Sequence, residues 1–121
     1  MSWYVEQILL SEAGFEVDID SDSFSDLLSI EIMVSKLDKK GLISRREFVI
    51  LQLIKSGFGF KQISELLEID KRTVIQTYKG ICAKLAFFLG DHFTDQGYLD
   101  YLSTKYHLDE DEIEILCKIL E

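Results

Sequence analysis

The stretch KQISELLEIDKRTVIQTYKGICAKL, residues 61–85, decides the predicted fold of this 121-residue chain. Apolar residues recur in it every three or four positions, which is the period of an α-helix with one buried side. Because Asp70 is a typical helix-capping residue, the stretch divides into two predicted helices, about 61–68 and 71–89. The apolar stripe of the second helix consists of Val74, Tyr78, Ile81 and Leu85.

Two short helices joined by a tight turn form a helix-turn-helix when apolar residues at fixed offsets hold them together. The residues predicted to pack between the two helices are Ile63, Leu66, Leu67, Ile69 and Val74. With these residues inside, the outward side of the second helix carries Lys71, Arg72, Ile75, Gln76 and Lys79. Such side chains suit DNA, because Arg and Lys donate to guanine edges or phosphates, Gln pairs with adenine, and Ile contacts a thymine methyl. Residues of this kind are also common on ordinary solvent-exposed helices. From this pattern alone, a DNA-contacting face and an ordinary exposed face both stay open.

The rest of the chain also carries the start and stop signals of helices. It has no proline and is 47% apolar, which predicts an all-α fold around one core. Ser44 with Glu47, and Asp109 with Glu112, have the spacing of capping boxes. An extended loop is expected over residues 15–23. Further helices are predicted from Ser2 to Gly14, from Ser23 or Ser25 to Gly41, over 45–56, from Asp91 or Thr94 to about Tyr106, and from Asp109 onward.

Residues 42–85, LISRREFVILQLIKSGFGFKQISELLEIDKRTVIQTYKGICAKL, resemble a known four-helix DNA-binding unit. This unit is shared by the C-terminal, promoter-recognising domain of bacterial sigma factors and by LuxR-type regulators. The family has glycine at the position of Glu68 and alanine at the position of Ser64. The matching positions are Ser44-Arg45-Arg46-Glu47, Gly57, Lys61-Gln62-Ile63-Ser64, Leu66-Leu67, Ile69-Asp70, Thr73-Val74 and the LuxR-like ending Ile81…Lys84-Leu85.

The resemblance implies a helix-turn-helix unit over residues 42–90, with additional N-terminal and C-terminal helices. An acidic helical segment, 1–41, would precede the unit, and acidic helices, 91–121, would follow it within one compact domain. Base contacts are expected from Lys71, Arg72, Ile75 and Gln76. Phosphate contacts are expected from Arg45, Arg46, Lys61, Thr73, Lys79 and Lys84.

Charge is segregated along the chain, whose net charge is −9. Residues 1–35 contain eight acidic and no basic residues, residues 36–84 contain eleven basic and five acidic residues, and residues 85–121 contain two basic and nine acidic residues. Acidic ends oppose attraction to DNA only over about 8 Å at physiological salt. They are therefore expected to face away from DNA, to bind a basic surface such as that of RNA polymerase, or to cover the basic face until a partner displaces them.

The terminal helices add a hypothesis about assembly. Their apolar stripes are expected to pack on the central unit, or else one of them forms a homodimer contact that presents two recognition helices to successive major grooves. The stripes consist of Trp3, Tyr4, Ile8 and Leu9 at one end and Ile113, Leu116, Cys117 and Leu120 at the other.

Other kinds of site find little support in the sequence. His92 and His107 lie near aspartates, but no spacing places two imidazoles on one helical face, so no metal site and no cofactor are predicted. No nucleophilic arrangement is readable, and an enzyme is not expected. Two unpaired cysteines, the lack of a membrane-length apolar run and an N-terminus without a basic flank predict a cytoplasmic protein that does not bind membranes.

The sequence therefore predicts a sequence-specific DNA-binding regulator of transcription. The alternative hypothesis is a protein-interaction module that uses the same fold to bind RNA polymerase or another regulator, with little DNA affinity of its own.

Overall fold

The computed structural model describes residues 3–15, 24–90, 93–94, 103 and 106–120 of the chain. The fold is all-α, as predicted, and the described residues contain no strand. The predicted loop after Phe15 and most of the predicted helix ending at Tyr106 lie outside the described residues. The helices are α1 (Trp3–Glu12), α2 (Phe24–Lys39), α3 (Arg45–Lys55), α4 (Phe60–Leu67), α5 (Lys71–Leu89) and α7 (Glu110–Leu120).

Both predicted capping boxes are present. The backbone N–H of Glu47 donates to Ser44 Oγ at 3.1 Å, and the backbone N–H of Ser44 donates to Glu47 Oε1 at 2.8 Å. The same reciprocal pair joins Asp109 and Glu112, with N–H to carboxylate distances of 2.8 and 3.3 Å. These bonds satisfy N–H groups that a helix leaves without partners in its first turn, so α3 and α7 begin where the sequence predicts.

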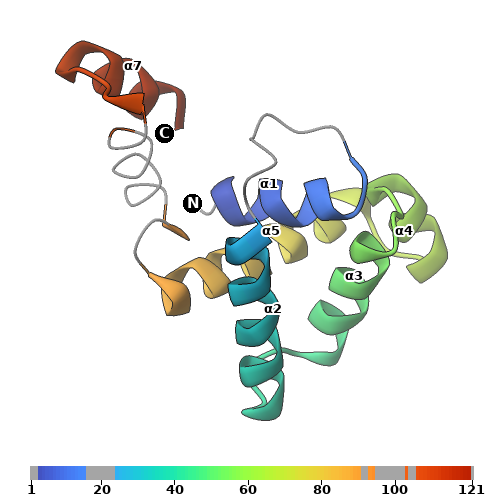
Figure 1. The fold of residues 1–121 in the computed structure, drawn as a ribbon. Coiled ribbons are helices and arrows are strands. Elements are labelled where there is room, and N and C mark those ends of the chain that lie inside the picture. The colour runs from blue at the N-terminus through green and yellow to red at the C-terminus, as the bar shows by residue number, and fades with distance from the viewer. Residues whose placement is uncertain (1–2, 16–23, 91–92, 95–102, 104–105, 121) are drawn as a thin grey trace.

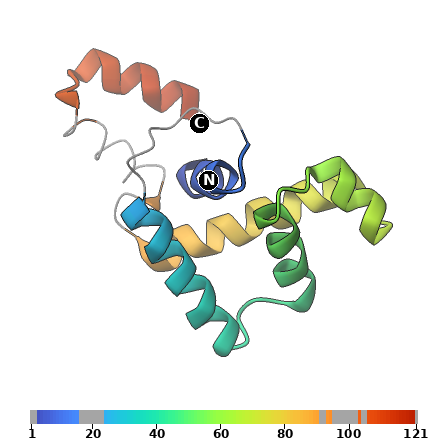
Figure 2. The ribbon, with the colours of Figure 1, turned by 45° about the vertical axis from the view of Figure 1, so that its right-hand side comes forward.

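Helix α5 is the central element of the fold. In both ribbon views α1 lies above it and α2 and α3 extend below it, while α4 sits at its N-terminal end (Figures 1 and 2). The predicted stripe of α5 is buried along its length, and Cys82 and Ala86 are buried with it. The core against which α5 packs includes Val5 and Ile8 from α1, Ile30 and Leu37 from α2, and Ile50 and Ile54 from α3.

One buried hydroxyl joins the two halves of the sequence. Tyr78, only 1% exposed, donates its hydroxyl hydrogen to the backbone carbonyl of Glu6 in α1 at 2.7 Å. The ring of Phe60, at the start of α4, lies 5.7 Å from the Tyr78 ring between centroids. Tyr78 therefore ties α1 and α4 to the first half of α5.

One prediction about the connection between α4 and α5 is wrong, and another, that Asp70 caps α5, is confirmed in position only. Leu66, predicted to be in the core, is 58% exposed. The side of α4 that meets α5 carries Phe60, Ile63 and Leu67, which lie within about 60° of one another around the helix axis. Leu66 lies about 60° beyond Ile63, outside this buried sector. Asp70 has the extended backbone of a capping residue, but its side chain makes no capping hydrogen bond.

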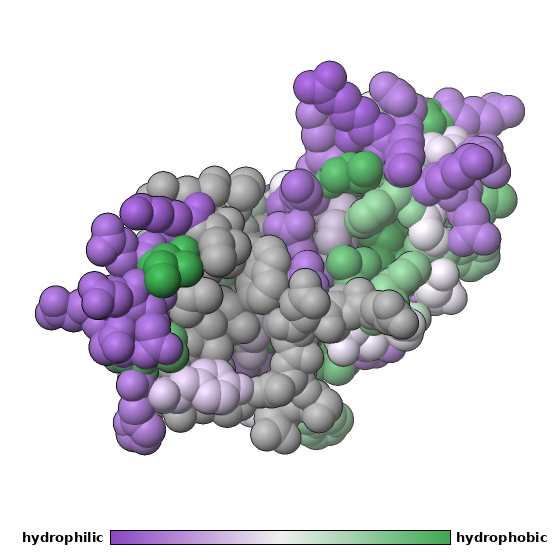
Figure 3. All heavy atoms as spheres, turned by 90° about the horizontal axis from the view of Figure 1, so that it is seen from above, coloured by the Kyte–Doolittle hydropathy of each residue, from purple (hydrophilic) through white to green (hydrophobic). Residues whose placement is uncertain are grey.

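Helix α7 stands apart from α1–α5 in both ribbon views (Figures 1 and 2). Its exposed residues are mostly acidic. Seen from above, the end of the molecule where α7 lies is largely hydrophilic, and the opposite end shows hydrophilic and hydrophobic residues side by side (Figure 3). None of the described helices is long and apolar enough to cross a membrane.

Candidate nucleic-acid interface

The candidate interface begins with the way α4 is held in front of α5. The backbone N–H of Gly59 donates to Gln62 Oε1 at 2.9 Å, which fixes the start of α4. This bond was not predicted from the sequence, although a Gln three residues after the N-cap residue is a recognisable signal of a helix start. At the other end Glu68 adopts the left-handed conformation, with φ 55° and ψ 42°, and the N–H of Ile69 donates to the Ser64 carbonyl at 3.1 Å. The left-handed residue turns the chain so that Asp70 can start α5.

The outward side of α5 carries three long polar side chains in its first three turns. Arg72, Gln76 and Lys79 are exposed and follow one another at spacings of four and three, so they share one face of the helix. From Arg72 to Lys79 the helix advances about 10 Å, which is comparable with the roughly 12 Å width of the DNA major groove. Within the described part of the chain none of the three takes part in an ion pair, and their donors face solvent.

The other predicted contacts on α5 lie beside this face. Lys71 is exposed in the first turn, whereas Thr73 and Ile75 are half-buried. The backbone carbonyl of Thr73 accepts the hydroxyl of Thr77 at 2.7 Å. By the helical period, Thr73 and Ile75 lie at the two edges of the face that Arg72 and Gln76 occupy.

Three further predicted contacts come from neighbouring helices. Lys61 is exposed in the first turn of α4, and Arg45 and Arg46 are exposed in the first turn of α3. No ion pair uses these three residues within the ranges that the structure describes. The α3 pair begins a helix that packs against both α4 and α5, so the same core positions all of these cations.

Lys84 differs from the other predicted contacts. Its Nζ donates to the Leu42 carbonyl at 2.6 Å and lies 3.2 Å from Glu47 Oε1, and its side chain is 30% exposed. The ammonium therefore holds the start of α3 on α5 and, unlike the other predicted contacts, is engaged inside the fold. Partial burial opposes the charge of Glu47, but the bond from the Ser44 N–H and the Lys84 ammonium outweigh it and lower the pKa of the Glu47 carboxyl.

Carboxylates also lie on the helix-turn-helix. Glu65 on α4, Glu68 in the turn and Asp70 before α5 are all exposed. Each would weaken attraction to phosphates at short range, since unlike the acids of α7 they belong to the same two-helix unit. The first half of α5 itself contains only basic and neutral side chains.

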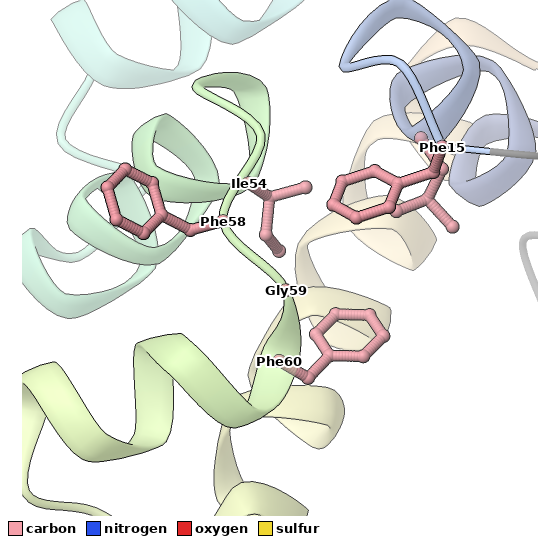
Figure 4. Close-up of a pocket in the computed structure, with 6 residues that line it drawn as sticks. Phe15, Ile54, Phe58, Gly59 and Phe60 are labelled. Atoms are coloured by element: carbon pink, nitrogen blue, oxygen red, sulfur yellow. The ribbon is translucent and has the colours of Figure 1, made fainter.

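An apolar cavity of about 230 Å³ lies where the end of α1 meets the connection between α3 and α4. Its lining is Leu10, Phe15, Ile54, Phe58, Gly59 and Phe60 (Figure 4). The rings of Phe15 and Phe60 lie on one side of Ile54 and the ring of Phe58 on the other. Since no lining side chain can transfer a proton, act as a nucleophile or bind a metal, the cavity offers no catalytic chemistry.

The described residues also bring together no cluster of three or more metal-ligating side chains. Burial, with the nearby charge of Glu6, raises the pKa of the Cys82 thiol well above its ordinary value, and the hydroxyl of Tyr78 partly offsets this. Burial raises the pKa of the Tyr78 hydroxyl as well, so both groups stay protonated and structural at neutral pH.

No protein-family model, no curated protein and no solved structure matches this chain.

Proposed function

We propose that this chain is a sequence-specific DNA-binding regulator of transcription that lays the first half of α5 in a major groove. The observation that carries the proposal is the face made by Arg72, Gln76 and Lys79, which is exposed and free of internal ion pairs in the described chain. Two other lysines of the fold do have internal partners, Lys84 with Glu47 at 3.2 Å and Lys55 with Glu31 at 3.5 Å. Basic side chains without internal partners keep their donors available to a polyanion.

The rigidity of α5 supports this role. Its inward side is fully buried, and Tyr78 is tied to α1 by a hydrogen bond, so the outward side chains project from a fixed rod. A fixed helix loses little conformational freedom on binding, and this favours affinity. Arg72 is suited to a guanine edge and Gln76 to an adenine, while Lys61, Lys79, Arg45 and Arg46 would hold phosphates.

The experiment is fluorescence anisotropy of a labelled duplex pool against salt concentration, with the full chain. Three to five phosphate contacts predict a slope of about −3 to −4.5 in log K against log salt. Arg72→Ala should weaken binding by about 1–3 kcal/mol. Lys118→Ala, which removes the same charge from an exposed position on α7, is the matched control and should change binding little.

Gln76→Ala keeps the net charge and separates base recognition from phosphate attraction. It should leave the salt slope unchanged and reduce the preference among sequences in a selected duplex pool. Absence of duplex binding at low salt even after removal of residues 107–121, or equal losses for Arg72→Ala and Lys118→Ala, would contradict the proposal.

The net charge of −9 favours a second candidate, a module that binds RNA polymerase or another regulator and has little affinity for DNA. In that case the full chain and a form lacking the acidic residues 107–121 would both fail to bind the duplex pool at low salt, whereas the full chain would bind purified polymerase. Recovery of duplex binding on removal of 107–121 would instead support a regulator whose acidic end restrains it.

A further inference from the structure

The apolar cavity of about 230 Å³ at the end of α1 takes no part in the proposed contact with DNA. Its walls come from three separate parts of the fold, with Leu10 and Phe15 from the end of α1, Ile54 from α3, and Phe58, Gly59 and Phe60 from the place where α4 begins (Figure 4). The cavity is partly open to solvent, so a small molecule can enter it while the helices stay folded. These six lining residues present no charged or polar side chain.

We propose that this cavity binds a small neutral aromatic molecule with two fused rings, of the size of indole or naphthalene. The volume of the cavity is the first argument. An apolar cavity of about 150 Å³ lined by leucine, isoleucine and phenylalanine stays dry and accepts benzene. The cavity in this protein has a similar lining and is about one and a half times as large, which matches the addition of a second fused ring.

The backbone groups beside the cavity already have partners within the protein. The N–H of Gly59 donates to Gln62 Oε1 at 2.9 Å, and the N–H of Phe58 donates to the Leu53 carbonyl at 3.1 Å. The Gly59 carbonyl accepts the N–H of Ile63 at 3.0 Å. Because these groups are satisfied, they offer little to a water molecule, which needs two to four polar partners to be held in a cavity. The wall therefore favours an apolar ligand over water, and over a charged ligand whose desolvation the lining side chains would not offset.

The phenylalanine rings of the wall favour an aromatic ligand over an alkyl chain. The rings of Phe15 and Phe60 lie on one side of Ile54, and the ring of Phe58 lies on the other (Figure 4). An aromatic ring has a negative face and a positive edge, so a flat aromatic ligand can make offset or edge-to-face contacts with these rings. An alkyl chain of the same volume lacks this electrostatic contribution.

Contacts outside the cavity hold its walls in place. The ring of Phe60 packs against the ring of Tyr78, with 5.7 Å between centroids, and the Tyr78 hydroxyl bonds to α1. The N–H of Phe15 donates to the Leu10 carbonyl at 3.0 Å, which closes the end of α1. Walls that are already fixed lose little conformational freedom when a ligand enters, and this favours affinity.

Titration of the full chain with indole, followed by NMR of the isoleucine methyl groups, tests the proposal. A ligand of about ten heavy atoms is expected to bind with a Kd of about 0.1–1 mM. The methyl signals of Ile54 should shift and saturate and should show nuclear Overhauser contacts with indole, whereas those of the core residue Ile30 should stay unchanged. At about ten times the Kd, indole should raise Tm by about 4–7 °C. Indole-3-carboxylate, which adds a charge to the same ring system, should bind at least about tenfold more weakly.

Leu10→Trp places a larger side chain in the cavity and should abolish saturable binding of indole. Leu27→Trp makes the same substitution at a half-buried leucine on α2 outside the cavity, and this matched control should bind indole like the unaltered chain. Circular dichroism checks that both variants are folded, and the Overhauser contacts locate indole in the unaltered chain independently of either variant.

The proposal would be overturned if the Ile54 signals did not move up to the solubility limit of indole, or if the Overhauser contacts placed indole elsewhere. Equal affinities for indole and its carboxylate would also overturn it, as would unchanged binding by a folded Leu10→Trp variant. No DNA is present in these measurements, so their result is independent of the proposed function.

Discussion

The turn before α5 offers a direct test of how the helix-turn-helix is built. Helices α1, α2, α3 and α4 end in the same way, with a left-handed residue followed by an N–H that bonds to the carbonyl five residues earlier: Phe15 to Leu10, Leu42 to Leu37, Phe58 to Leu53, and Ile69 to Ser64. The same arrangement recurs at the left-handed His107, where the N–H of Leu108 bonds to the Ser103 carbonyl. The left-handed residue is glycine in the first three cases, namely Gly14, Gly41 and Gly57, and Glu68 in the fourth. A side chain in this conformation brings Cβ too close to a carbonyl oxygen, which glycine avoids.

The expected effect of Glu68→Gly is a gain in the free energy of unfolding. Relief of the left-handed conformation is worth about 1–2 kcal/mol. The greater freedom of glycine in the unfolded chain takes back about 0.4–1 kcal/mol. The net gain is about 0.5–1 kcal/mol, or a rise in Tm of about 2–5 °C for a domain of this size.

Glu65→Gly is the matched control, because it replaces the same side chain at an exposed position three residues earlier, inside α4. Glycine in a helix interior costs about 0.5–1 kcal/mol, so this variant should be destabilised. Urea unfolding followed by far-ultraviolet circular dichroism measures both, with the m-value as a check that the transition is unchanged. A Glu68→Gly variant that loses stability, or two variants that change stability in the same direction, would refute the reasoning.

Two further predictions concern buried and paired side chains. In a Cys117→Ser variant the remaining thiol of Cys82 should react with a chromogenic disulfide about a thousandfold more slowly in the native protein than in denaturant. The reason is that the thiol is fully buried and its pKa is raised. Rapid reaction of the native protein would contradict this. Glu47→Gln, which keeps an acceptor for the Ser44 N–H, should cost about 0.5–1 kcal/mol at pH 7 by loss of the ion pair with Lys84. Because the pKa of Glu47 is lowered in the folded state, the stability that its charge contributes is present above the pKa of the unfolded chain. The difference in free energy of unfolding between the unaltered chain and Glu47→Gln should therefore shrink as the pH falls below about 4.3. A difference that persists at lower pH would argue against the ion pair.

Local signals predicted the helices well. The capping boxes at Ser44 and Asp109 depend only on residues three positions apart, and the buried stripe of α5 depends only on the helical period. Leu66 shows the limit of such signals, because it was predicted in the core and is exposed. On a short helix with several apolar residues, the helical period alone does not tell which of them face the neighbouring helix. Which side is buried depends on the direction from which α5 arrives.

For the candidate interface, the sequence predicted which side of α5 is exposed but not which of its lysines are engaged inside the fold. The sequence identified Arg72, Gln76 and Lys79 as outward-facing, since their positions follow from the stripe opposite them. Lys84 has the same charge and lies on the same helix, yet its ammonium is held by Glu47 and Leu42, residues 37 and 42 positions away. No local pattern distinguishes a lysine that faces solvent from one that meets a distant acceptor.

The sequence by itself determined the all-α class, the positions where most helices begin and end, and which side of α5 faces inward, because all of these are set by interactions within about five residues. Only the tertiary structure decided that α5 is the central helix, that Tyr78 bonds to α1, that Lys84 is engaged, and that an apolar cavity lies between the end of α1 and the start of α4. These features arise from contacts between segments far apart in the chain, and a contact of that kind exists only once the packing of several helices has chosen one arrangement among many.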